Sequence, residues 1–225
     1  MPDHSDSRAG DSAQREYQRR QDRRTERARQ RYGPLGVLAA NWIGDPSTEA
    51  WRQGAAGEQH AARQLAKHLR RSELILIHDR RIPGRGRGRG RGNIDHLVIG
   101  RAGIIVIDTK STRGNVQLTM TPFFRRELLR VNGRDRTRQL DALERQIEVV
   151  SRALARAGAG SVVVTGALCY PFMRRRWLHN SRARGGAIIV DQPRQIAKLA
   201  RRAGPLTPSE ISQLAEILQR ALPPA

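Results

Sequence analysis

Two carboxylates and an amine stand at the ends of an apolar stretch, residues 93–110. Asp95 lies near its start, and Asp108 and Lys110 close it. Carboxylate oxygens are preferred ligands of hard divalent cations such as Mg²⁺, and a nearby ammonium can orient an attacking water or stabilise a developing negative charge. A cation held there would polarise a phosphodiester and lower the pKa of a bound water. Burying such groups unpaired costs roughly 2–7 kcal/mol for a polar group and more for a charge, so we expect compensating partners.

The stretch itself has the pattern of a buried β-hairpin. Two runs rich in Ile and Val, residues 94–99 and 104–107, flank a four-residue turn bounded by glycines. Side chains alternate along a strand, so Asp108 and Lys110 share the face of every second apolar residue before them. An acid and an amine therefore project from the end of a core face. His96 alternates away from the preceding aspartate, and we interpret it as a buried hydrogen-bonding residue rather than a ligand.

Two helices are expected to bring further polar groups to the hairpin. The first is predicted over about residues 54–71, where an apolar stripe at helical spacing leads back to Glu58. A carboxylate near a helix N-terminus is also favourable for electrostatic reasons alone, so two interpretations of Glu58 stand side by side. The second helix is predicted over about residues 135–157 and ends at a glycine. Gln139 and Gln146 flank its apolar stripe, and Gln139 is the preferred candidate for the site.

Lysine is rare in this chain, which makes its position informative. Lys67, Lys110 and Lys198 are the only lysines among 42 basic residues. A compact ammonium differs from the planar guanidinium of arginine in geometry and in pKa range, so a lysine beside an aspartate indicates a specific role. The structural alternative is a strand-end lysine whose stem lies along apolar surface while its charge reaches water.

The net charge of +21 predicts a polyanionic partner, most simply nucleic acid. Residues 1–50 hold nine arginines and eight acids, so a charge of +20 falls on residues 51–225. An idle basic surface is the alternative. Two loops are the expected phosphate contacts, because arginine contacts to phosphate are largely independent of sequence. The candidate residues are Arg85, Arg87, Arg89 and Arg91 in an Arg-Gly repeat, and Arg174, Arg175 and Arg176.

Several classes of protein are disfavoured by composition. The single Cys169 excludes an intramolecular disulfide and a cysteine-based zinc cluster, which fits a reducing cytoplasm. The N-terminus has no apolar signal segment, and the longest apolar-leaning run near it, residues 35–43, is too short to span a bilayer. Cytoplasmic localisation without membrane association is therefore expected. An aromatic content of 4% argues against a single-strand-binding module built on base stacking.

The order of predicted elements is α-β-β-β-(ββ)-α-β-β-α-α, which indicates an α/β fold with a mixed central sheet flanked by helices. Residues 1–50 read as a charged arm that is loosely helical or disordered. Residues 51–170 are expected to form the main domain. Residues 171–225 are expected to be an extension of a basic loop, a strand and two helices packed on that domain. A helix start is predicted at Thr207-Pro208-Ser209-Glu210, a capping box.

Four segments in this order, residues 54–58, 78–84, 93–96 and 103–110, together with Gly114, resemble the nuclease-related domain. That domain is similar to the PD-(D/E)xK nucleases and to restriction endonucleases, so the resemblance implies an αβββαβ core. It covers roughly residues 54–169. Each motif is weak alone, and the ordered set carries the resemblance.

The resemblance implies roles for individual residues. Asp95 and Asp108 resemble the metal-binding acids, and Lys110 resembles the catalytic lysine. Glu58 resembles the helix acid that completes the metal shell, to which a backbone carbonyl, that of Thr109, would add an oxygen. Gln139 is similar to the glutamine on the following helix. Many members of the family have glutamate where this chain has aspartate at position 108.

A nuclease dependent on Mg²⁺ or Mn²⁺, acting on DNA in preference to RNA, is the leading interpretation. The positions that correspond to the family's site all hold chemically competent residues, which a degenerate copy would be free to lose. The alternative is a non-catalytic basic nucleic-acid-binding module that retains the nuclease fold. A third interpretation is a structural protein whose charged arm recruits a partner.

Overall fold

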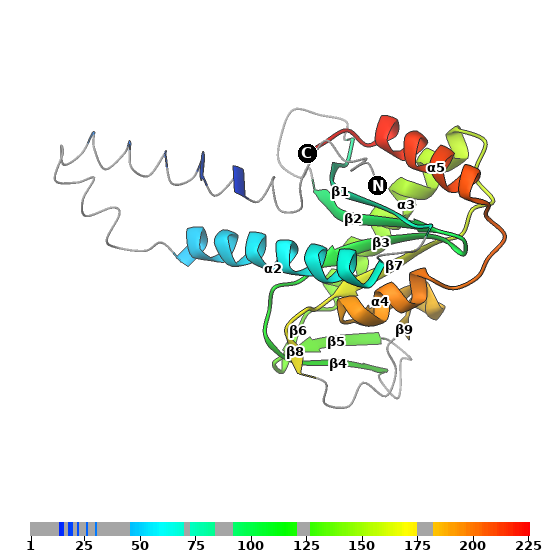
Figure 1. The fold of residues 1–225 in the computed structure, drawn as a ribbon. Helices are drawn as coiled ribbons and strands as arrows, with labels where there is room; N and C mark the ends of the chain where they lie inside the picture. Colours follow the sequence, from blue (N-terminus) through cyan, green and yellow to red (C-terminus); the bar gives the residue numbers. More distant parts are fainter. Residues whose placement is uncertain are drawn as a thin grey trace.

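The computed structural model describes residues 46–69, 73–83, 92–120, 127–174 and 182–225, together with seven single positions between residues 14 and 30. Within these ranges the chain forms a central sheet with helices on both faces and a second, smaller sheet beside it (Figure 1). The predicted α/β class with mixed strands flanked by helices is confirmed. The order α2-β1-β2-β3-α3-β7 is the expected αβββαβ core.

The large sheet has six strands in the order β1-β2-β3-β7-β10-β9. Antiparallel pairing joins β1 to β2, β2 to β3 and β10 to β9, whereas β3, β7 and β10 are mutually parallel. The predicted hairpin is confirmed as the β2–β3 pair, closed where Gly100 pairs with Gly103. The strands are β1 (Ile75–Arg81), β2 (Asn93–Gly100), β3 (Gly103–Thr109), β7 (Val164–Cys169), β10 (Ile188–Asp191) and β9 (Arg182–Ala183).

Helices cover both faces of the large sheet, so each face buries its own apolar cluster. The helices α3 (Arg138–Arg156) and α5 (Pro208–Ala221) lie over one face, against side chains that include Ile104 and Val106. The helices α2 (Pro46–Leu69) and α4 (Pro193–Ala200) lie over the other face, which includes Ile105 and Ile107. The alternation within β3 thus separates the two clusters as the sequence pattern predicts.

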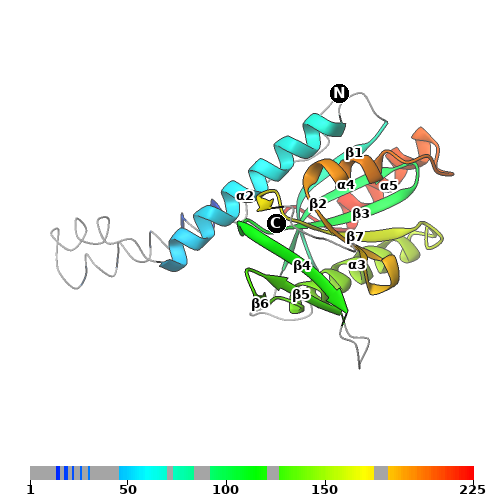
Figure 2. The same cartoon turned by 90° about the horizontal axis from the view of Figure 1, so that it is seen from below.

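The small sheet has four strands in the order β6-β5-β4-β8. In Figure 2, β4, β5 and β6 lie together to one side of the large sheet. The sequence pattern predicts one mixed central sheet, whereas β4 and β5 lie in this second sheet. The second sheet is separate because β4 has no pairing with β3 and joins β8 over only two paired residues. The strands are β4 (Gly114–Met120), β5 (Glu127–Val131), β6 (Arg134–Asp135) and β8 (Met173–Arg174).

The helix ends follow local signals. α3 stops at Arg156, and Gly158 takes a φ of 78°, which favours glycine. The capping box of α5 is present: the Thr207 hydroxyl accepts from the Glu210 amide, and the Glu210 carboxylate accepts from the Thr207 amide. α2 begins eight residues earlier than expected, since its first turns lack the apolar stripe on which the prediction rested. None of the helices in the described ranges is both long and apolar enough to cross a membrane.

Candidate active site

The polar groups singled out in the sequence lie at one end of the large sheet, where β2 begins and β3 ends. Asp95 and Asp108 stand one step beyond the backbone pair of His96 with Ile107, so they face each other across the hairpin. Asp95 Oδ2 accepts a hydrogen bond of 2.6 Å from the Thr109 amide. Both aspartates are buried, with exposed fractions of 9% and 6%.

Glu58 reaches this end from α2 because the helix passes very close to the segment that follows β3. A Cβ at Gly57 would stand 2.5 Å from the Ser111 Cβ, so only glycine allows this approach. α2 packs on one face of the sheet. By strand alternation, Asp108 shares the opposite face with Ile104 and Val106. Glu58 and Asp108 nevertheless influence each other, since Asp108 stands at the strand end, where no further sheet separates the two faces.

The carboxylates destabilise one another's charges. Burial, followed by the charges of Asp79 and Asp108, raises the pKa of Glu58 to about 7, against a smaller opposing effect of Lys110. Burial also raises the pKa of Asp95 well above its usual range, and Glu58 and Asp108 raise it further. The three acids therefore lie close enough to share one electrostatic environment, which lacks sufficient positive charge.

Lys110 is the cation of this environment. Its Nζ donates a hydrogen bond of 2.7 Å to Asp108 Oδ1, and its amide donates to the Cys169 carbonyl of β7. Burial alone would lower the pKa of Lys110, but Asp108, Asp95 and Glu58 outweigh it, and the pKa is raised. The amine therefore stays protonated at neutral pH. This ion pair favours a specific role for Lys110 over the alternative of a strand-end lysine whose charge reaches water.

Asp79 belongs to the same environment and is missing from the sequence prediction. It is fully buried near the end of β1, with a φ of 49°, and its Oδ1 accepts from Asn93 Nδ2 at 2.8 Å. Its Oδ2 lies 3.8 Å from Arg15 of the N-terminal segment. One signal was available: like Asp108, this aspartate ends an apolar strand.

The two candidate glutamines of α3 differ in placement. Gln139 lines a cavity of about 600 Å³ together with Lys110, and its Oε1 accepts a hydrogen bond from the Tyr170 hydroxyl. Gln146 instead donates to the Asn93 carbonyl at 3.4 Å, on β2. The structure therefore puts Gln139 beside the lysine, whereas Gln146 packs against the start of the hairpin. Nothing in the sequence pointed to Tyr170, which directly follows β7.

His96 has the structural role expected from strand alternation. It is fully buried, and its Nδ1 lies 2.9 Å from the His78 Nδ1 on the neighbouring strand. Burial, and then the charge of His78, lowers the pKa of His96 well below its usual range. The ring is therefore neutral, and it contributes no positive charge to the acids of the adjacent strand end.

A hard divalent cation fits the chemistry of the groups present. The donors are carboxylate oxygens, and both Glu58 Oε2 and Thr109 Oγ1 are buried without a hydrogen-bond partner. A cation between the acids would also relieve the repulsion that raises their pKa values. Within the described ranges, however, no three His, Cys, Asp or Glu side chains are already arranged as a set of metal ligands. Binding would require the carboxylates to turn toward a shared ion.

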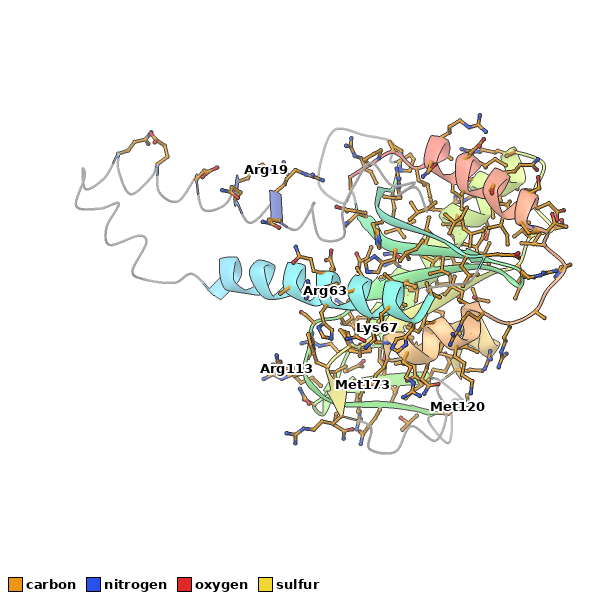
Figure 3. The ribbon with its side chains drawn as sticks, in the orientation of Figure 1. Arg19, Arg63, Lys67, Arg113, Met120 and Met173 are labelled. Carbon is orange, nitrogen blue, oxygen red and sulfur yellow. The ribbon has the colours of Figure 1, made fainter. Side chains whose placement is uncertain are left out.

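The candidate phosphate-binding arginines are only partly described. Arg174 is exposed in β8. Arg85, Arg87, Arg89 and Arg91, and likewise Arg175 and Arg176, lie outside the described residues. Other exposed cations surround the site: Figure 3 shows Arg63 and Lys67 along α2 and Arg113 where β4 meets β8.

Comparison with known proteins places these residues within the match to one family model. Residues 53–171 match the family model of the nuclease-related domain (NERD), which is just over half of the chain. The matched segment contains Glu58, Asp95, Asp108, Lys110 and Gln139. No curated protein matches the chain significantly, and neither does any solved structure.

Proposed function

The chain belongs to the nuclease-related domain family, and from this premise we propose that it is a metal-dependent nuclease that hydrolyses phosphodiester bonds, with DNA as its favoured substrate. The observation that carries the proposal is the mutual influence of Glu58, Asp95 and Asp108 around Lys110 in a buried site. Buried acids that repel one another either stay protonated or bind a cation. At neutral pH, oxygen ligands of this kind select Mg²⁺ or Mn²⁺.

Each acid has a part in holding the cation. The carboxylates of Asp95, Asp108 and Glu58 would bind Mg²⁺, with the Thr109 carbonyl as a further oxygen ligand. When bound, the cation supplies charge neutralisation and activation of water. Asp95 is oriented for this role by the Thr109 amide, which fixes one of its two oxygens and leaves the other available.

Lys110 acts as a cation and not as a base. Its raised pKa keeps the proton on Nζ at neutral pH, so it cannot accept a proton from the attacking water. It can orient that water and stabilise the negative charge that develops on the phosphate. Gln139 lines the same cavity as Lys110, where its amide can position the water or a phosphate oxygen.

Incubation of the purified chain with supercoiled plasmid and linear duplex DNA, in Mg²⁺, Mn²⁺ or EDTA, tests the proposal. Cleavage is expected with either metal and not with EDTA, and Asp108→Ala should abolish it while DNA binding persists. A matched control is Asp22→Ala, an exposed acid of the N-terminal segment. Cleavage by Asp108→Ala at the wild-type rate would remove the site from the reaction.

Metal binding has a readout that does not depend on cleavage. The melting temperature of the wild-type chain should rise with Mg²⁺ or Mn²⁺, because a ligand that binds only the folded state stabilises it. Asp108→Ala should lose most of that rise. Equal shifts in the two proteins would show that the cation binds elsewhere.

One observation favours the alternative, a non-catalytic basic nucleic-acid-binding module. Lys110 already neutralises Asp108, and the described acids are not arranged as a complete ligand set. This alternative predicts duplex binding that is the same in Mg²⁺ and EDTA, no cleavage with either metal, and no melting shift. The same set of assays therefore separates the two functions.

We also propose that the protein works in the cytoplasm. The supporting observation is that the chain has one cysteine, Cys169, which is fully buried in β7 and has no disulfide partner. Fractionation of cells that produce the protein, with detection by antibody, tests this placement.

A further inference from the structure

A cavity opens from the lysine side of the site toward the small sheet. It has a volume of about 600 Å³ and is lined by Lys110 and by the first turn of α3 with the residues just before it. Its charged or amide lining residues are Lys110, Asp135, Arg136, Arg138, Gln139 and Asp141. The cavity thus continues directly from the groups assigned to the reaction.

The acids of this cavity already have partners within the protein. Asp135 Oδ1 accepts a hydrogen bond of 2.8 Å from the Thr137 amide. Asp141 is hydrogen-bonded by Arg184, which also lies 3.8 Å from Glu127 and 3.6 Å from Glu144. These carboxylates are therefore held in place by partners within the protein, and Arg184 offsets one of the three negative charges around it.

The arginines of the cavity differ from the acids in this respect. Arg136 and Arg138 are exposed, and their side chains make no hydrogen bond or ion pair with any described residue. Arg136 also acts on the interior of the site, where its charge opposes the rise in the pKa of Tyr170 caused by burial and by Asp108. The cavity therefore combines acids that are held by partners within the protein with cations that are available to a ligand.

The start of α3 does not itself provide an anion site. The Gln139 amide donates to the Arg136 carbonyl, the Leu140 amide donates to the Thr137 carbonyl, and the Thr137 amide is taken by Asp135. With these amides occupied, an anion in the cavity would be bound by the arginine side chains rather than by the helix end.

The small sheet extends the cationic surface beyond the cavity. Arg130 is exposed in β5 and pairs in register with Gln117 on one side and Asp135 on the other. Like those of Arg136 and Arg138, its side chain has no hydrogen bond or ion pair with a described residue. The described strands β4, β5, β6 and β8 contain no aromatic residue, so they offer phosphate contacts and no surface for base stacking.

We propose that Arg130, Arg136 and Arg138 form a phosphate track that carries the backbone of duplex nucleic acid from the small sheet to Lys110. The inference rests on the proposed function, because it names the surface that delivers a substrate to that site. A duplex keeps its bases stacked inside and presents phosphates outward, which suits a row of guanidinium groups without aromatic side chains. Phosphate contacts of this kind do not discriminate between base sequences.

A salt titration of duplex affinity, carried out in EDTA, tests the track without cleavage. The test variant replaces Arg130, Arg136 and Arg138 with Ser. The control variant replaces Arg156, Arg201 and Arg202 with Ser, which removes the same charge. Arg201 and Arg202 are exposed near Gly204, which packs on the Arg101 carbonyl in the β2–β3 turn, at the other end of the sheet. Arg156 is exposed at the end of α3.

The test variant should lose up to about 2–3 units of the slope of log K against log salt, at roughly 0.9 per phosphate contact. The control variant should keep the wild-type slope to within about 0.5. Replacement of the same three track residues by Lys should preserve the slope, since charge is retained. Melting temperatures of all variants should equal that of the wild type, which shows that they fold.

Three outcomes would overturn the track: equal losses in the test and control variants, an unchanged slope in the test variant, or no salt-dependent duplex binding by the wild type. Parallel titrations with duplex RNA and single-stranded DNA identify which nucleic acid binds to the track. A loss confined to single strands would also overturn the proposal. Absence of cleavage with a clear loss of slope would leave the track in place and remove the nuclease assignment, so the two failures are distinguishable.

Discussion

The two ends of the large sheet are made by the same strands and differ in how they are closed. At one end the β2–β3 turn packs against the segment before β7, and Gly103 lies so close to Val163 that a Cβ would stand 2.3 Å from its carbonyl oxygen. At the other end the buried Asp95 and Asp108 lie beside the half-buried Lys110. Close packing stabilises the fold at the glycine-closed end. At the charged end, burial and mutual repulsion of the acids lower the stability of the fold. The comparison teaches that the groups of the candidate site gather at one end of the sheet, whereas close backbone packing closes the other end.

The largest expected effect is on cleavage at the charged end. Lys110→Ala should reduce metal-dependent cleavage by about 10²–10³-fold, because it removes a preorganised charge from the site. Lys110→Arg should be almost as impaired, since a planar guanidinium does not occupy the place of an ammonium. Initial rates on plasmid DNA measure both effects.

Lys198→Ala is the matched control, as Lys198 is exposed on α4 and away from the site. Its rate should equal that of the wild type. If Lys110→Ala and Lys198→Ala cut DNA equally fast, the charged end has no special role and the contrast between the two ends disappears.

The next effect is on stability at the glycine-closed end. Gly103→Ala should lower the free energy of unfolding by roughly 2–5 kcal/mol, because a side chain would clash with backbone at a φ of 122°. Gly133→Ala is the control: its φ is 76°, but nothing lies within 4 Å, so a cost of about 1–2 kcal/mol is expected. Urea unfolding compares the two variants, and similar losses would contradict the importance of close packing at this turn.

A smaller effect should appear as a pH dependence of stability at the charged end. The pKa of Glu58 is about 7 in the folded chain and near its ordinary value of 4.5 when unfolded. Between these values the folded state binds more protons, so stability falls as pH rises through that window. Glu58→Gln should remove this loss and stabilise the chain at pH 8 by roughly 2–3 kcal/mol in EDTA.

Melting in EDTA at pH 4 and pH 8 measures the effect of Glu58→Gln, with the two proteins expected to be nearly equal at pH 4, below the pKa of the carboxyl in both states. Addition of Mg²⁺ at pH 8 should narrow the difference, because the cation favours the ionised carboxylate only in the wild type. If Glu58→Gln were less stable than the wild type at pH 8, the predicted direction of the stability change would be wrong.

The smallest effect concerns the link between the sheet and α3. Tyr170→Phe should cost about 1 kcal/mol, since it removes the hydroxyl that donates to Gln139. It should also lower cleavage several-fold if Gln139 positions a reacting group. Thr207→Ala removes a hydroxyl of similar worth at the start of α5, so it should cost about 1 kcal/mol without any change in cleavage. Equal cleavage by the two variants would show that Gln139 acts only in folding.

Local sequence patterns predicted the elements that short-range physics determines. The β2–β3 hairpin follows from two Ile- and Val-rich runs around a glycine turn, and the end of α3 follows from Gly158. The polar ends of those strands could also be identified, because Asp95, Asp108 and Lys110 break an apolar pattern.

Groups that meet through distant segments could not be predicted in the same way. Asp79 joins the site because the chain takes a φ of 49° there and Asn93 of the next strand holds its carboxylate. Gln139 and Tyr170 meet across 31 residues. The small sheet depends on a two-residue pairing with β8 that is too short to leave a periodic signal.

The outer edge of β1 has a consequence for self-association. An unpaired strand edge is a template for another chain, and β1 would offer one along its length. The segment that follows α5 covers the last residues of this edge: the Arg81 amide donates to the Pro223 carbonyl, and the Ala225 amide donates to the Asp79 carbonyl. The opposite edge of the sheet, β9, is only two residues long. Removal of residues 223–225 would therefore uncover this part of the longer edge, and the shortened chain should form oligomers or aggregates at concentrations at which the 225-residue chain does not.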